Sequence, residues 1–163
     1  MIKQIWKPRV SAKNNGDFIS IQPYSGYRIY FIDPDAAEYL LDPNVSDENL
    51  GVAVMDALKQ SRFLSYEDAC DLEVKFDQGY YISWIKNIMN QYVYKTKRAL
   101  FKNMKNCSIE SHDGLITIKP SKHEKLEGWS GNGINKEDYV RIPVNSTFYE
   151  IGAALRLAFT RCI

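Results

Sequence analysis

Apolar residues recur with helical spacing in two segments that lie 101 residues apart. The first segment covers residues 46–62, and its apolar stripe consists of Leu50, Ala53, Val54, Ala57 and Leu58. The second segment covers residues 147–162, and its stripe consists of Ile151, Ala154, Leu155, Ala158 and Phe159. The shared spacing i, i+3, i+4, i+7, i+8 places these residues on one face of a helix. Because Ser46 and Thr147 also suit helix N-caps, both segments are predicted to be amphipathic helices.

Two shorter segments alternate between apolar and polar residues. Residues 17–23 read DFISIQP, and residues 114–120 read GLITIKP. This alternation predicts short strands that end at proline, and the turn residues before each strand predict hairpins. Each half of the chain therefore follows one plan of hairpin, linking segment with a short strand, and helix, which predicts half-repeats in residues 1–64 and 95–163. Chance similarity between such short motifs is the alternative.

Residues 65–94 are predicted to join the two halves as a helical segment. Apolar residues at helical spacing predict a helix over residues 78–92, and Ser65 suits the cap of a shorter helix before it. Residues 121–138 contain three glycines and are predicted to be mostly loop, followed by a last strand over residues 139–142. The predicted fold class is α+β, with a largely antiparallel sheet packed against about three helices. The length of 163 residues suits a single domain over residues 1–163.

The net charge of +1 hides a strong segregation along the chain. Residues 33–77 contain twelve acidic and three basic residues, a net charge of −9, whereas residues 78–109 contain six basic residues and no acidic one. An acidic surface of this size steers a basic partner toward it. A solvated face that the basic segment balances is the alternative. The near-zero total excludes binding of nucleic acid over the whole surface.

Sequence motifs for catalysis, cofactors and metals are not found. Neither His112 nor His123 has a second ligand at metal spacing, and no phosphate-binding loop, dinucleotide fingerprint or nucleophile elbow occurs. A cysteine site that pairs Cys107 with a histidine stays open, although a free cysteine is more often a small buried residue. No cofactor or metal is predicted.

Targeting signals are also missing from the sequence. No apolar run approaches the roughly 20 residues of a membrane span, and the first residues lack the apolar core of a secretory signal. The three cysteines are odd in number and far apart along the chain. They are therefore predicted to be reduced thiols of a cytoplasmic protein.

A basic segment over residues 95–105 suggests a second class of function. It carries five lysine or arginine residues, and Tyr92, Tyr94 and Phe101 lie among or beside them. Basic and aromatic residues in this pattern can hold a phosphate backbone and stack on bases, which predicts an RNA-binding accessory protein. A solvated edge with lysine stems over apolar surface is the alternative.

Two long segments carry a family resemblance. Residues 94–129, YKTKRALFKNMKNCSIESHDGLITIKPSKHEKLEGW, and residues 142–162, IPVNSTFYEIGAALRLAFTRC, resemble the CdiI-type immunity proteins of contact-dependent growth inhibition (CDI) systems. The resemblance implies a bacterial cytoplasmic protein that is not an enzyme and that binds the C-terminal toxin domain of a cognate CdiA-type exoprotein. Such toxin domains are commonly nucleases, often directed at tRNA, and the immunity protein occludes the active site or the substrate-binding surface. The matching residues are mainly core-type, so they imply the fold and not the toxin contacts.

Candidate toxin-binding residues come from the acidic segment. A nuclease presents a cationic cleft, and carboxylates placed where phosphates would sit can fill it. The first candidates flank two prolines in a predicted loop and are Asp33, Asp35, Glu38 and Asp42; the next are Glu67, Asp68, Asp71, Glu73 and Asp77. Tyr24, Tyr27 and Tyr39 are candidate aromatic anchors for the centre of the interface. This interface predicts an association rate that falls as salt rises.

Overall fold

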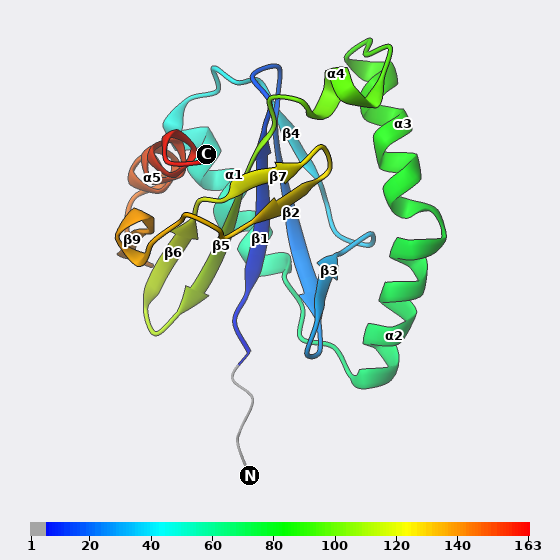
Figure 1. The fold of residues 1–163 in the computed structure, drawn as a ribbon. Helices are drawn as coiled ribbons and strands as arrows, with labels where there is room; N and C mark the ends of the chain where they lie inside the picture. The colour runs from blue at the N-terminus through cyan, green and yellow to red at the C-terminus, as the bar shows by residue number, and fades with distance from the viewer. Residues whose placement is uncertain (1–5) are drawn as a thin grey trace.

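An antiparallel sheet forms the centre of the fold. A computed structural model describes residues 6–163 of the chain (Figure 1). Within these residues the sheet contains seven strands: β1 (Arg9–Asn14), β2 (Ile19–Gly26), β3 (Tyr30–Ile32), β4 (Tyr39–Leu41), β5 (Lys105–His112), β6 (Leu115–Lys119) and β9 (Val140–Pro143). Their order is β3-β2-β1-β5-β6-β9, and β4 pairs with β2 beyond the end of β3. Because side chains alternate along each strand, the sheet has one apolar face and one more polar face.

Helices α1 (Asp47–Gln60) and α5 (Phe148–Thr160) cover the apolar face of the sheet. The strand residues beneath them are fully buried and include Val10, Ile21, Ile109 and Ile118. The two helices cross at a pair of glycines. A Cβ atom added to Gly51 or to Gly152 would lie 1.8 Å from a backbone carbonyl oxygen of the other helix. The backbones therefore touch directly, which only glycine permits.

The two halves of the sheet follow matching registers on either side of the β1–β5 pair. Ser11 faces Ser108 at the centre of this pair. The hairpin partners Ala12 and Ile21 correspond to Ile109 and Ile118, each 97 residues later. Later in each half the separation between corresponding residues is 101: β9 corresponds to β4, and α5 corresponds to α1. The half-repeat stays a prediction, and these registers support it.

A helical arc lies on the other side of the sheet. It consists of α2 (Tyr66–Lys75), a π-helical turn (Phe76–Tyr80) and α3 (Tyr81–Gln91), and Figure 1 shows it running along the β3 side of the molecule. The short helix α4 (Lys97–Phe101) follows. A second apolar cluster joins the arc to the sheet through buried Phe18, Trp84, Ile88 and Phe101. No helix within residues 6–163 is long and apolar enough to span a bilayer.

The fold class is confirmed, as are the two amphipathic helices, which Ser46 and Thr147 cap through their side chains. The prediction of a loop over residues 121–138 was wrong. This segment contains a hairpin of β7 (Lys122–Lys125) and β8 (Gly128–Ser130), followed by a 3₁₀ turn, Lys136–Asp138. Trp129 fixes the hairpin, because its Nε1 donates to the Met104 carbonyl at 2.9 Å and its ring stacks on His123.

The prediction that the first strand ends at Pro23 was also wrong, because β2 continues to Gly26. The Pro23 carbonyl accepts a hydrogen bond from the Asp33 backbone N–H at 2.9 Å, so this part of Pro23 faces the outer side of β2. On that side, β4 pairs with residues 19–21 of β2 and β3 pairs with residues 24–26. Pro23 lies between these two pairings, so neither strand needs a backbone N–H donor from it. A proline is therefore tolerated inside the strand.

Candidate functional site

Five predicted acidic residues are exposed along the helical arc. We call them the α2 carboxylates: Glu67, Asp68, Asp71, Glu73 and Asp77. Ser65 starts the helix, since its hydroxyl accepts from the Asp68 backbone N–H at 3.1 Å, and acidic residues in the first turn suit the helix dipole. In the part of the chain that the structure describes, none of the five forms an ion pair. Their charge is available to a partner.

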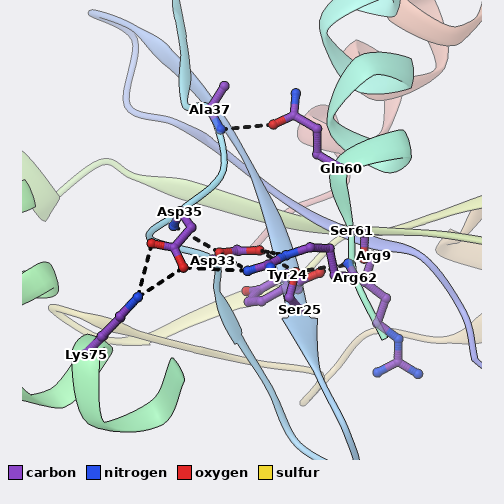
Figure 2. Close-up of polar contacts among 10 residues, drawn as sticks. All are labelled: Arg9, Tyr24, Ser25, Asp33, Asp35, Ala37, Gln60, Ser61, Arg62 and Lys75. Atoms are coloured by element: carbon purple, nitrogen blue, oxygen red, sulfur yellow. Dashed lines mark hydrogen bonds and ion pairs between the residues drawn. The ribbon is translucent and has the colours of Figure 1, made fainter. Parts of the chain in front are cut away.

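Asp33, by contrast, is buried, and Figure 2 shows the polar contacts around it. Its side chain accepts hydrogen bonds from Arg62 Nε at 2.8 Å and Nη2 at 3.0 Å, and from the Ser25 hydroxyl at 2.7 Å. Burial disfavours the charged carboxylate, but the hydrogen bonds from Arg62 and Ser25 outweigh it and hold the pKa of Asp33 below its usual value. This carboxylate ties the β3 end to the segment after α1 and is not exposed to a partner.

Of the three other acids in the predicted loop, one makes internal contacts and two are exposed. Glu38 accepts from the Ser20 hydroxyl at 2.7 Å and from Trp84 Nε1, so it links the sheet to α3. Asp35 is exposed and lies 3.2 Å from Lys75 Nζ, which joins this loop to α2 (Figure 2). Asp42 is exposed and accepts from the Asn44 backbone N–H at 2.8 Å. Asp35 and Asp42 can therefore add to the acidic surface, whereas Glu38 has a structural role.

The three candidate tyrosines lie in different places. Tyr24 lines a cavity of about 600 Å³ between the polar face of the sheet and the helical arc, and burial raises the pKa of its hydroxyl. The Tyr39 hydroxyl accepts from the Gln60 side-chain amide at 2.8 Å and its ring packs on the core. Tyr27 lies near the acidic surface, with its ring stacked 5.8 Å from Phe63. Of the three, Tyr27 is best placed to contact a partner.

An exposed apolar group that the sequence did not reveal lies beside the α2 carboxylates. Ile29, Phe63 and Tyr66 are 68%, 50% and 69% exposed. A hollow of about 440 Å³ lies between the β2–β3 turn and α2, and its lining includes Tyr27, Ile29, Tyr66 and Glu73. We call these apolar residues, with Tyr27, the turn patch. Their exposure carries no signal in the sequence, because Ile29 and Phe63 lie in short linkers and Tyr66 begins α2, places where an apolar residue can be buried or exposed.

The basic segment does not present aromatic residues for base stacking. Phe101 is 1% exposed in the second apolar cluster. The Tyr92 ring packs 4.8 Å from Phe18, and the Tyr94 hydroxyl donates to Asp17. Lys97 and Arg98 of α4 are exposed, and Lys97 lies 3.8 Å from Glu127. The apolar residues of this segment anchor α4 to the second apolar cluster, and its lysine and arginine side chains lie at the surface.

The alternative that pairs Cys107 with a histidine is not favoured by the geometry. Cys107 is fully buried and its Sγ contacts Cys162 Sγ. His112 pairs with Asp113, and the His123 ring contacts the Leu126 carbonyl. Within residues 6–163, no group of three or more His, Cys, Asp or Glu residues is arranged to hold a metal ion.

Unpaired carboxylates next to exposed aromatic and aliphatic side chains are typical of proteins that recognise another protein. Comparison with known proteins gives the family. Residues 8–162 match the family described as "CdiI: CDI immunity protein". The chain is 45% identical over 175 aligned positions to the immunity protein CdiI-YPIII of Yersinia pseudotuberculosis serotype O:3 (strain YPIII), covering 99% of this chain and 97% of that protein. The chain therefore belongs to the CdiI family of CDI immunity proteins.

Two solved structures are similar over nearly the whole chain. A Neisseria meningitidis protein of unknown function has a TM-score of 0.88 and 33% identity, covering 100% of this chain and 99% of that one. A chain from a CdiA-CT/CdiI toxin and immunity complex of Yersinia pseudotuberculosis has a TM-score of 0.85 and 40% identity, covering 98% and 99%. Both similarities agree with the α+β fold described above.

Proposed function

We propose that this protein binds the C-terminal toxin domain of a cognate CdiA protein in the cytoplasm and neutralises it without catalysing a reaction. Membership of the CDI immunity protein family supports this function. The similar Yersinia structure is a complex of a CdiA-CT toxin with its immunity protein, and 40% identity across the chain supports the same class of partner here.

The proposed toxin is a nuclease, and the α2 carboxylates cover its phosphate-binding surface. The observation that carries this proposal is the exposure of five unpaired carboxylates within residues 67–77. A unit charge pair at 4 Å contributes about 1 kcal/mol in water and about 4 kcal/mol near a protein surface. Several such pairs accelerate capture, and desolvated apolar residues such as those of the turn patch slow dissociation.

A double charge reversal on α2 tests the proposal. Glu67→Lys with Asp71→Lys is expected to lower the association rate with the catalytically inactive toxin about 10- to 100-fold at low salt and to flatten its salt dependence. The matched control is Glu48→Lys with Glu137→Lys, two exposed carboxylates without an ion pair elsewhere on the surface. The control is expected to stay within about twofold. Stopped-flow fluorescence at several salt concentrations measures both rates.

Two outcomes would contradict parts of the proposal separately. Equal losses in the α2 and control variants would show a general effect of charge and remove the α2 carboxylates from the interface. A toxin that is bound and neutralised, yet cleaves no tRNA, rRNA or DNA on its own, would remove the nuclease while leaving the immunity function. Retention of labelled tRNA by this protein alone, with a salt slope typical of phosphate contacts, would favour RNA binding instead.

A further inference from the structure

Two cysteines that are far apart in the sequence meet at the C-terminal end of α5. Cys107 lies on β5 and Cys162 follows the last turn of α5. Their Sγ atoms are 3.6 Å apart, and both thiols are free. The third cysteine, Cys70, lies on α2. The fold therefore creates one close thiol pair and leaves one separate thiol.

We infer that Cys107 and Cys162 form an oxidisable dithiol site, which a small hydroperoxide converts to an intramolecular disulfide. Cys162 is the thiol that reacts with the peroxide, and Cys107 is the thiol that resolves the product. This site does not depend on toxin binding.

The surroundings of the pair assign these two roles. Cys162 is partly exposed and lines a hollow of about 280 Å³, together with Lys105 and His123, through which a small oxidant can approach. Cys107 is 0% exposed, and its Sγ lies 3.6 Å from Cys162 Sγ, so it is placed to react with a modified Cys162 and not with an oxidant in solution. The hydrogen bond from Cys107 lowers the pKa of Cys162 to about 7, and a thiolate is the reactive form of cysteine.

The backbone around Cys162 is held against the β6–β7 segment. The Ile163 backbone N–H donates to the Ser121 carbonyl at 3.0 Å, and the His123 backbone N–H donates to the Ile163 carbonyl at 2.7 Å. Cys162 follows the end of the helix, and its Sγ lies 3.7 Å from the Ala158 carbonyl oxygen and 3.6 Å from the Asn106 carbonyl oxygen. Movement toward Cys107 gives up these two weak thiol contacts and none of the backbone hydrogen bonds of α5. The Sγ–Sγ distance must shorten from 3.6 Å to the roughly 2.05 Å of a disulfide.

The proposed reaction is balanced with one peroxide. The Cys162 thiolate attacks one peroxide oxygen, the O–O bond breaks, and the leaving oxygen takes up a proton, which yields Cys162 sulfenic acid and water (or an alcohol from an organic hydroperoxide). The Cys107 sulfur then attacks the sulfenic sulfur, the S–S bond forms and the S–O bond breaks. The released hydroxide takes the Cys107 proton to give water. Two electrons pass from the two sulfurs to the peroxide.

The corresponding positions of the N-terminal half carry no thiols. By the registers described above, Val10 corresponds to Cys107 and Ser61 to Cys162. The Ser61 hydroxyl accepts from the Arg9 backbone N–H at 3.0 Å, so an ordinary hydroxyl holds that place. A valine and a serine therefore fill the matching site, and the thiol pair adds a reactivity that the first half lacks.

Peroxide treatment of the full, folded chain tests the site. Titration with hydrogen peroxide, followed by thiol counting in denaturant, is expected to lower the count from three to one. Trypsin cleavage after Lys105 and Arg161 is expected to yield a peptide of residues 106–122 linked to the peptide that begins at Cys162. Cys70→Ser is the matched control and is expected to form the same linkage at the same rate.

The resolving role of Cys107 has its own readout. In Cys107→Ser, Cys162 sulfenic acid has no partner, so dimedone labelling of Cys162 is expected to rise at least tenfold over the wild-type chain. Cys107→Ser is a buried substitution and can unfold the protein, so a second variant is made at the partly exposed Cys162. Cys162→Ser is expected to form no intramolecular disulfide. A wild-type thiol count that stays at three, a linkage through Cys70, or equal oxidation of all three thiols would overturn the inference.

Discussion

Replacing Asp33 with asparagine tests whether this carboxylate stabilises the fold and has no part in the toxin interface. Asp33 is 1% exposed and accepts four hydrogen bonds, from Arg62 twice, from Ser25 and from the Asp35 backbone N–H. Asparagine keeps the shape but replaces one acceptor oxygen by an amide donor. The matched control is Asp35→Asn, in which a half-exposed carboxylate loses ion pairs at 3.2 and 3.7 Å.

The expected losses follow from the hydrogen bonds and their exposure. A hydrogen bond to a charged group contributes about 1.5–3 kcal/mol, and Asp33→Asn loses at least one to Arg62. The Arg62 side chain is 47% exposed and regains water, which lowers the cost of breaking the pair. We therefore expect Asp33→Asn to lower the free energy of unfolding by about 2–3 kcal/mol. Exposed ion pairs contribute about 0–1 kcal/mol, which is the loss expected for Asp35→Asn.

Urea unfolding at pH 7, followed by circular dichroism, measures both losses. The sign of the pH dependence is fixed by the lowered pKa of Asp33 in the folded state. The unfolded chain binds the proton more tightly, so the stabilisation is complete above the unfolded pKa of about 3.9 and is lost as the pH falls through the folded pKa. Equal losses in the two variants, or a wild-type advantage that grows below pH 4, would refute this reasoning. Folded Asp33→Asn should bind the toxin at the wild-type rate.

Two further substitutions test the close contact between α1 and α5 at Gly152 and the charge of Lys13 on β1. Gly152→Ala places a Cβ 1.8 Å from the Asp47 carbonyl oxygen and should cost about 3 kcal/mol in urea unfolding, whereas Gly131→Ala, with no atom within 4 Å, should cost under about 1 kcal/mol. Burial lowers the pKa of Lys13 to about 8, so the unfolded chain holds more protons between about pH 8 and 10.5 and wild-type stability should rise with pH there. Lys13→Met should lack this rise when urea midpoints at pH 7.5 and 9.5 are compared; an equal rise in both proteins would assign it to other groups.

The elements that could be predicted from the sequence are those whose signals are local. A stripe of apolar residues and a capping hydroxyl lie within a few residues of each other, so α1 and α5 were predicted closely. The β7–β8 hairpin could not be predicted, because polar residues form it and Trp129 holds it to a distant carbonyl. Strand formation there depends on tertiary contacts that override local preference.

The candidate site also contains residues that a local signal predicts and residues whose surroundings depend on distant parts of the chain. Exposure of the α2 carboxylates follows from a capped helix with few apolar positions, which can be predicted from the sequence. The burial of Asp33 cannot, because its partner Arg62 is 29 residues away and reaches it only through the fold. Trp84, which binds Glu38, is 46 residues away. A count of acidic residues therefore overestimates the acidic surface, since some of these charges stabilise the protein interior.

The central place of β1 in the sheet has a consequence for biosynthesis. Its second neighbour, β5, begins at Lys105, about ninety residues after β1 ends. At about 5–20 residues per second, a ribosome needs roughly 5–18 seconds to supply that neighbour. Any hairpin of β1 and β2 that forms earlier shows an unpaired strand edge to the cell, and such edges recruit other strands. Slow translation between these two strands should therefore lower the yield of native protein more than an equal delay after β5.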